Sequence, residues 1–342
     1  MLTTASAAKT ERIAALDFTK GTLVLFMVLY HWINYFIGPL WEYYRYLRFL
    51  TPSFIFVTGF MISNVYLAKY DAADVRLPKR LFTRGIKLMG VFLVLNGARA
   101  LIVPALHTGS LGGNLLDPRN LFTIFVTGNF PLGGAKLISF SILVPISYLL
   151  MLSGILMVPF RSYRYTFHGV CLLLFLSIVI LGVMGAECQN LELVAIGMLG
   201  VVVGFVPIVK INKFVRHPYA VAFAYLCYVV AITVWNVPFP MQVIGVPLTL
   251  AAIYLIGSGD SEPGTMRNVV ILLGKYSLFG YIAQIAILQV MSVGLHSFSL
   301  GVVLLAISFL AVVALTIASV ELVDRARAKS KSVDRAYKIV FA

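Results

Sequence analysis

The feature that most constrains this chain is a succession of apolar blocks, each roughly 20 residues long. Crossing the roughly 30 Å hydrocarbon core of a bilayer takes about 20 apolar residues in a helix. Only 12% of the 342 residues are charged, while 60% are hydrophobic. A soluble domain carries about a quarter charged residues, so most of this surface must face something other than water. The sequence therefore predicts an all-α, polytopic membrane protein.

We expect ten spans in a single integral membrane domain over residues 1–342. The expected spans are residues 17–37, 49–68, 84–105, 137–160, 166–186, 191–209, 218–236, 240–257, 268–292 and 299–322. Residues 1–16 then form a cytoplasmic N-terminus, 17–322 the transmembrane bundle, and 323–342 a basic cytoplasmic tail. The first apolar run is too long for a secretory signal peptide and lacks a small-residue cleavage site, so it should stay as a span.

Basic residues outnumber acidic ones by 27 to 13, which gives a formal net charge of +14. On a soluble protein this excess would suggest nucleic acid as a partner. Here the basic residues lie in alternate connections between the apolar blocks, and all fall on one side if both termini are inside. The positive-inside rule therefore favours an even number of spans with cytoplasmic termini. A basic cytoplasmic face would also attract an anionic, phosphorylated cosubstrate.

The longest outer connection, residues 105–136, contains the apolar piece 121–126. This piece is too short to cross, so we expect an interfacial or re-entrant segment. If it did cross, the count would become eleven and the C-terminus would move outside, against the indication of the basic tail. Several outer residues could meet a substrate or be ordinary loop residues: Arg45, Arg48, His107, Asp117 and Arg119.

The three cysteines are Cys171, Cys188 and Cys227. Their spacing fits neither a metal site nor a disulfide framework, so we interpret them as packing residues. We therefore expect no bound metal.

The first expected span carries a lysine and a histidine on one face. Lys20 and His31 are eleven residues apart, which is three helical turns plus about 20°. Both side chains therefore project from one stripe, about 16 Å apart along the axis. Asp17 lies three residues before Lys20 and can pair with it. Asn34 and Tyr35 continue the stripe one turn beyond His31.

A histidine at mid-membrane depth is costly to keep and is by default a functional hypothesis. Its chemistry suits proton abstraction near neutral pH. The alternative is that His31 only hydrogen-bonds a neighbouring helix. Lys20 and Asp17 have a simpler alternative as well, because both could be interface residues whose charged groups reach the water.

The segment RIAALDFTKGTLVLFMVLYHWINYF resembles the first helix of the transmembrane acyltransferase superfamily. That superfamily includes acyltransferase family 3 and the bacterial relatives of heparan-α-glucosaminide N-acetyltransferase. Its pattern is a basic residue, ten positions and then a histidine, usually preceded by Leu-Asp-x-x-Arg-Gly. Here the pattern reads Leu16-Asp17-Phe-Thr-Lys20-Gly21, followed by His31.

Further segments resemble the same family in the same order. TPSFIFVTGFMIS (51–63) resembles its second helix, and PKRLFTRGIKLM (78–89) resembles the basic motif that enters its third helix. LLGKYSLFGYIAQIAIL (272–288) resembles its Gly-x-x-Ser-x-x-x-Tyr helix, and Glu321 followed by Arg325 resembles its acidic-basic terminus. Residues from about 105 to 265 match only in being helical and apolar.

The sequence departs from the family pattern at three places. Lys20 stands where arginine is commoner, which keeps the charge but loses the bidentate fork. Gln284 stands where many members have a histidine, so no second catalytic histidine is implied. Arg80 and Arg84 are four residues apart, a looser version of the usual basic pair.

The resemblance implies acyl transfer across a membrane. An acyl-CoA, by default acetyl-CoA, would bind from the cytoplasm as a cosubstrate with its phosphates on Arg80, Arg84 and Lys87. His31 would act as general base on the acceptor, or briefly carry the acyl group. Lys20, paired with Asp17, would bind phosphate or fix the path of the pantetheine arm.

The implied acceptor is a hydroxyl of a cell-surface or periplasmic glycan that enters from the outer side. Asn34, Tyr35, Tyr281 and Gln284 would then bind the substrates or stabilise the oxyanion. The resemblance implies no permanently bound cofactor and a location in the bacterial inner membrane, and it leaves a homodimer undecided. We expect Lys20, His31 and the basic cluster to line one cavity open to the cytoplasm.

Two other classes of function stay open. A proton-coupled secondary transporter or a flippase of a polysaccharide assembly system would also use an intramembrane histidine. The sequence shows no matching halves and no paired Gly/Pro breaks, which such carriers often have. A non-catalytic membrane component of the same system is the third class. The basic cluster, considered by itself, is also explained by membrane topology alone.

Overall fold

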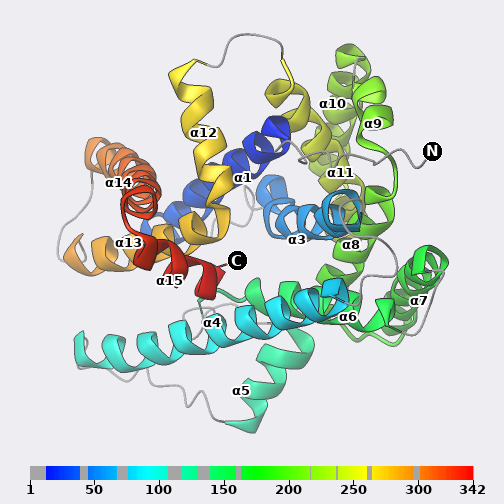
Figure 1. Ribbon diagram of the computed structural model, residues 1–342, viewed down its shortest axis with the longest axis horizontal. Coiled ribbons are helices and arrows are strands. Elements are labelled where there is room, and N and C mark those ends of the chain that lie inside the picture. Colours follow the sequence, from blue (N-terminus) through cyan, green and yellow to red (C-terminus); the bar gives the residue numbers. More distant parts are fainter. Residues whose placement is uncertain are drawn as a thin grey trace, which may run out of the picture.

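The computed structural model describes residues 13–38, 45–67, 76–106, 117–129, 139–158, 163–215, 217–235, 238–259, 264–295 and 301–341. Every regular element within these ranges is helical, as the apolar blocks predicted. The elements, arranged as in Figure 1, are α1 (Ala14–Phe36), α3 (Leu50–Met61), the π-helical η1 (Ile62–Leu67), α4 (Arg76–Leu106), α5 (Pro118–Phe122), the π-helical η2 (Thr123–Thr127), α6 (Leu143–Met157), α7 (Tyr163–Val183), α8 (Gln189–Gly204), α9 (Ile208–Val215), α10 (Pro218–Val234), α11 (Pro238–Gly257), α12 (Thr265–Lys275), α13 (Ser277–Leu295), α14 (Val302–Lys329) and α15 (Lys331–Phe341).

Six helices in the described part of the chain are long and apolar enough to cross a membrane. They are Arg45–Leu67, Arg76–Arg99, Arg164–Val183, Phe239–Gly257, Ser277–Leu295 and Val302–Lys329. Three further apolar helices, α6, α8 and α10, have 15, 16 and 17 residues. α1 has 23 residues, but Asp17, Lys20 and His31 lower its hydropathy. Six of the ten expected spans are therefore of membrane length, and the remaining four coincide with shorter or more polar helices.

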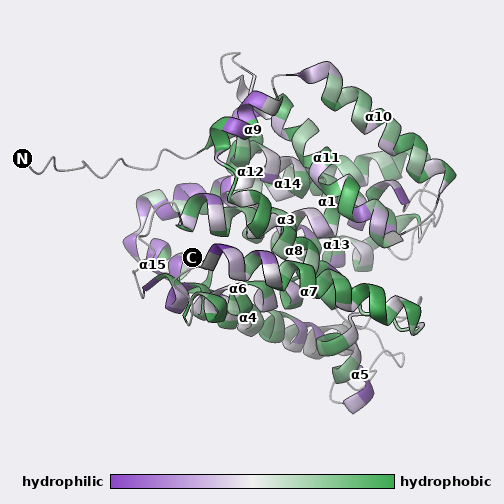
Figure 2. Cartoon of the chain, turned by 90° about the vertical axis from the view of Figure 1, so that its right-hand side faces the viewer, coloured by the Kyte–Doolittle hydropathy of each residue, from purple (hydrophilic) through white to green (hydrophobic). Residues whose placement is uncertain are grey.

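The outward surface of several helices is apolar, where a soluble protein would be polar. Leu172 on α7, Phe223 on α10 and Val302 on α14 are 71%, 69% and 83% exposed. Figure 2 shows apolar residues along α7 and α10, with hydrophilic residues on α9 and α15. Exposed apolar area on this scale suits contact with lipid rather than water.

Two glycines allow α1 and α12 to pack backbone against backbone. A β-carbon on Gly274 would overlap the carbonyl oxygen of Asp17, and one on Gly21 would overlap that of Val270. Small residues at such crossings are what lets membrane helices approach closely. The contact fixes the first turns of α1, and with them Asp17 and Lys20, against α12.

Contacts between helix termini define what we call the N-terminal end of the bundle, where α1 begins. Ala15 clusters there with Tyr254 of α11 and with apolar residues of α9. Asn64 of η1 donates hydrogen bonds to two carbonyls between the end of α8 and α9. Tyr66 of η1 accepts a hydrogen bond from Arg84 near the start of α4. The start of α4 therefore lies at the same end as the start of α1.

Another set of contacts marks the opposite end of the bundle. Tyr46 hydrogen-bonds Thr233 near the end of α10 at 3.0 Å. Asn96, in the second half of α4, donates to the carbonyl of Ser139, just before α6, at 2.8 Å. Helices that begin at one end therefore finish at the other, as in a bundle of antiparallel spans.

The apolar piece 121–126 falls within α5 and η2, which have five residues each. Asp117 caps α5 by accepting a hydrogen bond from the backbone N–H of Arg119 at 2.9 Å. Tyr148 of α6 donates to the Phe125 carbonyl at 2.7 Å, and Asn190 of α8 donates to the Ile124 carbonyl at 3.0 Å. The piece is a short helix anchored to α6 and α8, too short to cross a membrane. His107 lies outside the described residues.

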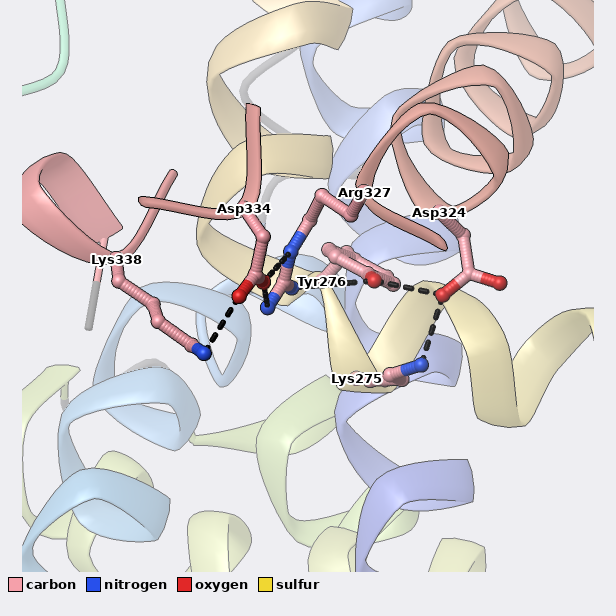
Figure 3. Close-up of polar contacts among 6 residues, drawn as sticks. All are labelled: Lys275, Tyr276, Asp324, Arg327, Asp334 and Lys338. Atoms are coloured by element: carbon pink, nitrogen blue, oxygen red, sulfur yellow. Dashed lines mark hydrogen bonds and ion pairs between the residues drawn. The ribbon is translucent and has the colours of Figure 1, made fainter. Parts of the chain in front are cut away.

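The basic tail forms the end of α14 and the short helix α15, which folds back on the bundle. Asp334 pairs with Arg327 at 2.6 Å and with Lys338 at 2.5 Å (Figure 3). Arg327 also donates to the hydroxyl of Tyr276 at 3.1 Å, and that hydroxyl donates to Asp324 at 2.6 Å. These bonds join α14 and α15 to the junction between α12 and α13.

Candidate functional site

His31 lies inside the bundle, on the face of α1 that meets α13. The centroid of its ring is 6.1 Å from that of Tyr281. Tyr281 packs in turn against Phe54 and Phe140, with centroids 6.5 and 6.0 Å apart. Nε2 of His31 is buried and has no hydrogen-bond partner within the described residues. If His31 served only to hydrogen-bond a neighbouring helix, such a bond would be expected, but Nε2 makes none within the described residues.

Gln284 follows Tyr281 by one turn of α13 and is fully buried. Neither its Nε2 nor its Oε1 has a hydrogen-bond partner among the atoms that the structure describes. Burying an amide without a hydrogen bond costs about 1–3 kcal/mol by protein mutational data. Gln284, which the sequence predicts as a substrate residue, therefore carries an amide whose burial no hydrogen bond within the described residues offsets.

Tyr35 lies one turn beyond His31 and belongs to the same group. It interacts electrostatically with Tyr281 of α13 and with Arg99 of α4. Asn34 is exposed instead, and the described contacts do not bring it to Tyr281. The predicted substrate residues Tyr35 and Tyr281 are therefore together, and Asn34 is apart from them.

A polar link between α4 and α13 was missed by sequence reasoning. Asn96 and Ser139 exchange two hydrogen bonds, at 2.8 and 2.9 Å, and Gln289 of α13 donates to the Ser139 hydroxyl at 3.0 Å. Arg99 lies one turn beyond Asn96 on α4. The available signal was Arg99 itself, because an ionisable residue inside an apolar span marks a position with a possible function and draws attention to the polar residues around it.

A basic cavity of about 550 Å³ lies at the N-terminal end of the bundle, between η1 and α4. Its lining carries five cations, Arg76, Lys79, Arg80, Arg84 and Lys87, together with Tyr66, Leu77, Leu81 and Thr83. Within this lining there is no carboxylate. The three residues predicted to bind the cosubstrate, Arg80, Arg84 and Lys87, are thus on one cavity wall, and Arg76 and Lys79 extend the set.

Helix geometry explains why these cations share a wall. Positions 76, 80, 84 and 87 are spaced by four, four and three residues, which places them on one face of α4. The guanidinium of Arg84 lies 5.5 Å from the centre of the Tyr66 ring and donates to the Tyr66 hydroxyl. Tyr66 therefore holds Arg84 in place within the wall that it shares with the other four cations.

Lys20 and Asp17 form the ion pair predicted from their spacing, with Nζ and Oδ1 2.5 Å apart. Asp17 is buried and Lys20 is mostly covered, so neither behaves as a fully solvated interface residue. The lining of the basic cavity includes neither Lys20 nor His31. Neither this cavity nor the smaller one at the opposite end of the bundle joins all three, so the expected single cavity is not found among the linings that the structure describes.

A second, much smaller cavity lies at the opposite end of the bundle. Its polar lining consists of Tyr30 from α1, Arg48 and Thr51 from the start of the helix Arg45–Leu67, Gln189 from α8 and Gln242 from α11. Of the outer residues named from the sequence, Arg48 lines this cavity. Arg45 donates to the carbonyl of Thr233 at 3.1 Å instead, and Asp117 caps α5.

The described residues contain no group of three or more potential metal ligands. Comparison with protein-family models, with curated proteins and with solved structures finds no match.

Proposed function

We propose that this chain is a membrane-bound acyltransferase, which moves an acyl group, by default acetyl, from acyl-CoA to a glycan hydroxyl. The basic cavity is the observation that carries the proposal. Its volume of about 550 Å³ suits a small-molecule site, and five cations line it with no carboxylate among them. Membrane topology alone requires basic residues on one side, but it does not require them to share a cavity.

Acyl-CoA matches this cavity in charge. CoA carries a pyrophosphate and a ribose phosphate, and guanidinium groups bind phosphate oxygens in bidentate pairs. Lysines add point charges that tolerate several phosphate orientations. Arg80, Arg84 and Lys87 would bind phosphate, with Arg84 positioned by its hydrogen bond to Tyr66.

His31 is the proposed general base. The acceptor hydroxyl attacks the thioester carbonyl carbon while Nε2 of His31 takes the hydroxyl proton. The hydroxyl of Tyr281 and the amide of Gln284 are the donors available for the tetrahedral oxyanion. Collapse of the intermediate breaks the C–S bond, and the leaving CoA thiolate receives the proton from His31, which restores the neutral imidazole.

We propose a matching topology with ten spans and cytoplasmic termini, in a bacterial inner membrane. The six membrane-length helices, the three shorter apolar helices and α1 would make the ten crossings. The N-terminal end of the bundle, with the basic cavity, would face the cytoplasm and its acyl-CoA. The opposite end would face the acceptor.

Thioester turnover by the full-length protein in lipid nanodiscs tests the proposal. We expect slow release of free thiol from acetyl-CoA, and a loss of about 100-fold or more in His31→Gln, which is the usual contribution of a general base. His168→Gln is the matched control, because His168 lies on the exposed side of α7 with a ring nitrogen bonded to the Arg164 carbonyl at 2.7 Å. Equal turnover in His31→Gln and wild type would refute the assigned role. Proton uptake by proteoliposomes without thiol release would favour a carrier.

A further inference from the structure

One side of the tail helix α15 packs on the bundle. Asp334, Tyr337 and Phe341 are spaced by three and four residues, so they share this side. The ring of Tyr337 meets that of Tyr276 with centroids 5.4 Å apart, and the ring of Phe341 meets that of Phe279 at 5.9 Å. Asp334 forms its ion pair with α14 on the same side. The orientation of α15 about its own axis is therefore fixed by these contacts.

The two remaining faces of α15 are exposed, and one is cationic while the other is apolar. Lys331 and Arg335 are one turn apart, and neither has an ion pair among the residues that the structure describes. Val333, Ala336 and Val340 are spaced by three and four residues, and Val333 is turned from Lys331 by about 200°. Val333 and Val340 are 39% and 40% exposed. The cationic face and the apolar face therefore lie on opposite sides of the helix.

The neighbours of α15 place it at the edge of the hydrocarbon layer. α13 has 19 residues and is therefore about 28 Å long, which matches the thickness of that layer. Phe279, in the first turn of α13, is then at one edge, and Tyr276, just before α13, donates to Asp324 of α14 at 2.6 Å. Lys331 follows Asp324 by seven residues, so α15 begins about 10 Å further along the α14 axis and returns to the edge at Phe341. This is the depth of the lipid headgroups.

α15 belongs to the N-terminal end of the bundle, which also carries the basic cavity. Gly274, two residues before Tyr276, packs against the carbonyl of Asp17 in the first turn of α1. α15 contacts α14 and α4 (Figure 1). Membrane topology explains why cations gather at this end. It does not explain why the cationic face of the tail helix is backed by an exposed apolar face.

We propose that α15 is an interfacial helix that binds anionic phospholipid. Lys331 and Arg335 bind the headgroups, while Val333, Ala336 and Val340 contact the upper part of the acyl chains. Amphipathic helices that lie in the membrane interface divide their faces in this way, and anionic lipid strengthens their binding. A zwitterionic headgroup carries its own cation beside the phosphate and attracts lysine and arginine less. The inference needs only a bilayer around the bundle and is independent of the proposed acyl transfer.

Amide hydrogen exchange of residues 331–341, measured by mass spectrometry on the full-length protein, tests the inference. The protein is compared in nanodiscs of phosphatidylcholine and in nanodiscs of phosphatidylglycerol. A lysine or arginine near an anionic surface strengthens binding by about fivefold, so Lys331 and Arg335 together contribute about 25-fold. Amides exchange when the segment that contains them opens locally, and we expect exchange about 25-fold slower in phosphatidylglycerol. Added salt should reduce this difference by screening the charges.

The double variant Lys331→Gln/Arg335→Gln should remove most of the difference between the two lipids. The matched control is Lys210→Gln/Lys213→Gln, which removes the same charge from exposed positions of α9 at the same end of the bundle. It should leave exchange of residues 331–341 as in the wild type. Val340→Ser should speed exchange in both lipids, because contact with acyl chains does not depend on headgroup charge.

Three results would overturn the inference. The first is equal exchange of residues 331–341 in the two lipids, and the second is a lipid difference that persists in the double variant. The third is slow exchange only where two copies of the chain share a nanodisc, which would make a second copy the partner of α15. If the double variant does not fold, the salt series on the wild type decides, because a lipid difference that salt leaves unchanged would exclude charge as its cause.

Discussion

Replacing Gln284 by methionine should stabilise the protein. Methionine keeps the unbranched shape of glutamine and removes both amide atoms, neither of which has a hydrogen-bond partner in the described structure. The relief should be about 1–3 kcal/mol, the usual cost of burying a polar group without a hydrogen bond. Stability gained in this way indicates that Gln284 is kept for a purpose other than folding.

The matched control is Gln289→Met on the same helix. Gln289 donates to the hydroxyl of Ser139 at 3.0 Å, so its replacement removes a bond rather than an unpaired group. Hydrogen bonds between membrane helices contribute about 0.6 kcal/mol on average, and this variant should be destabilised by about that amount. The two variants are thus expected to change stability in opposite directions.

Thermal unfolding in one detergent, followed by intrinsic fluorescence, measures both variants, and thiol release from acetyl-CoA measures their activity. We expect Gln284→Met to unfold at a higher temperature than wild type and to lose about 100-fold or more in turnover, the usual cost of an oxyanion donor. A lower unfolding temperature for Gln284→Met, similar to that of Gln289→Met, would refute the reasoning, because it would show that Gln284 is bonded in the folded protein.

Two further predictions concern the charged ends of the helices. Arg80→Gln should raise the KM for acetyl-CoA by about tenfold or more, because a hydrogen bond to a charged group contributes about 1.5–3 kcal/mol. Steady-state kinetics measure this change. The control is Arg325→Gln, on a side chain that is 75% exposed, which should leave KM unchanged. Lys338 and Arg327 hydrogen-bond the Asp334 carboxylate and hold its pKa below the usual range. Because the folded pKa is the lower one, this stabilisation is complete above about pH 4 and is lost as the pH falls through the folded value. The unfolding temperatures of wild type and Asp334→Asn should therefore differ at pH 7, and the difference should shrink as the pH falls through the lowered pKa of Asp334.

Local spacing accounts for the parts of the fold and the site that the sequence predicted. Apolar runs gave helices, and the four-residue spacing of Arg80 and Arg84 placed them on one face of α4. The spacing of Asp17 and Lys20 gave their ion pair. Each of these features is decided within a few turns of a single helix, where geometry alone fixes which side chains are neighbours.

Features that depend on contacts between distant helices could not be predicted in this way. The isolation of the Gln284 amide and the electrostatic contact between Tyr35 and Arg99 are set by how α1, α4 and α13 pack. The expected single cavity lined by Lys20, His31 and the basic cluster could not be decided from spacing for the same reason, and neither described lining joins them. Spacing places Lys20 and His31 on one stripe, but it says nothing of the ring of Tyr281 that α13 packs near His31.

The closed surroundings of His31 have a consequence for the proposed reaction. The lining of the basic cavity does not include His31, so the proposed reaction requires the acyl arm, or a ring packed near His31, to move. Phe140 is a candidate for this movement, because its φ of 64° lies in the left-handed region that non-glycine residues rarely adopt. Its ring nevertheless packs against Tyr281 and is buried. Backbone strain of about 1–3 kcal/mol is retained only where the surrounding structure enforces it, and the packing of the Phe140 ring against Tyr281 is a contact that helps to enforce it.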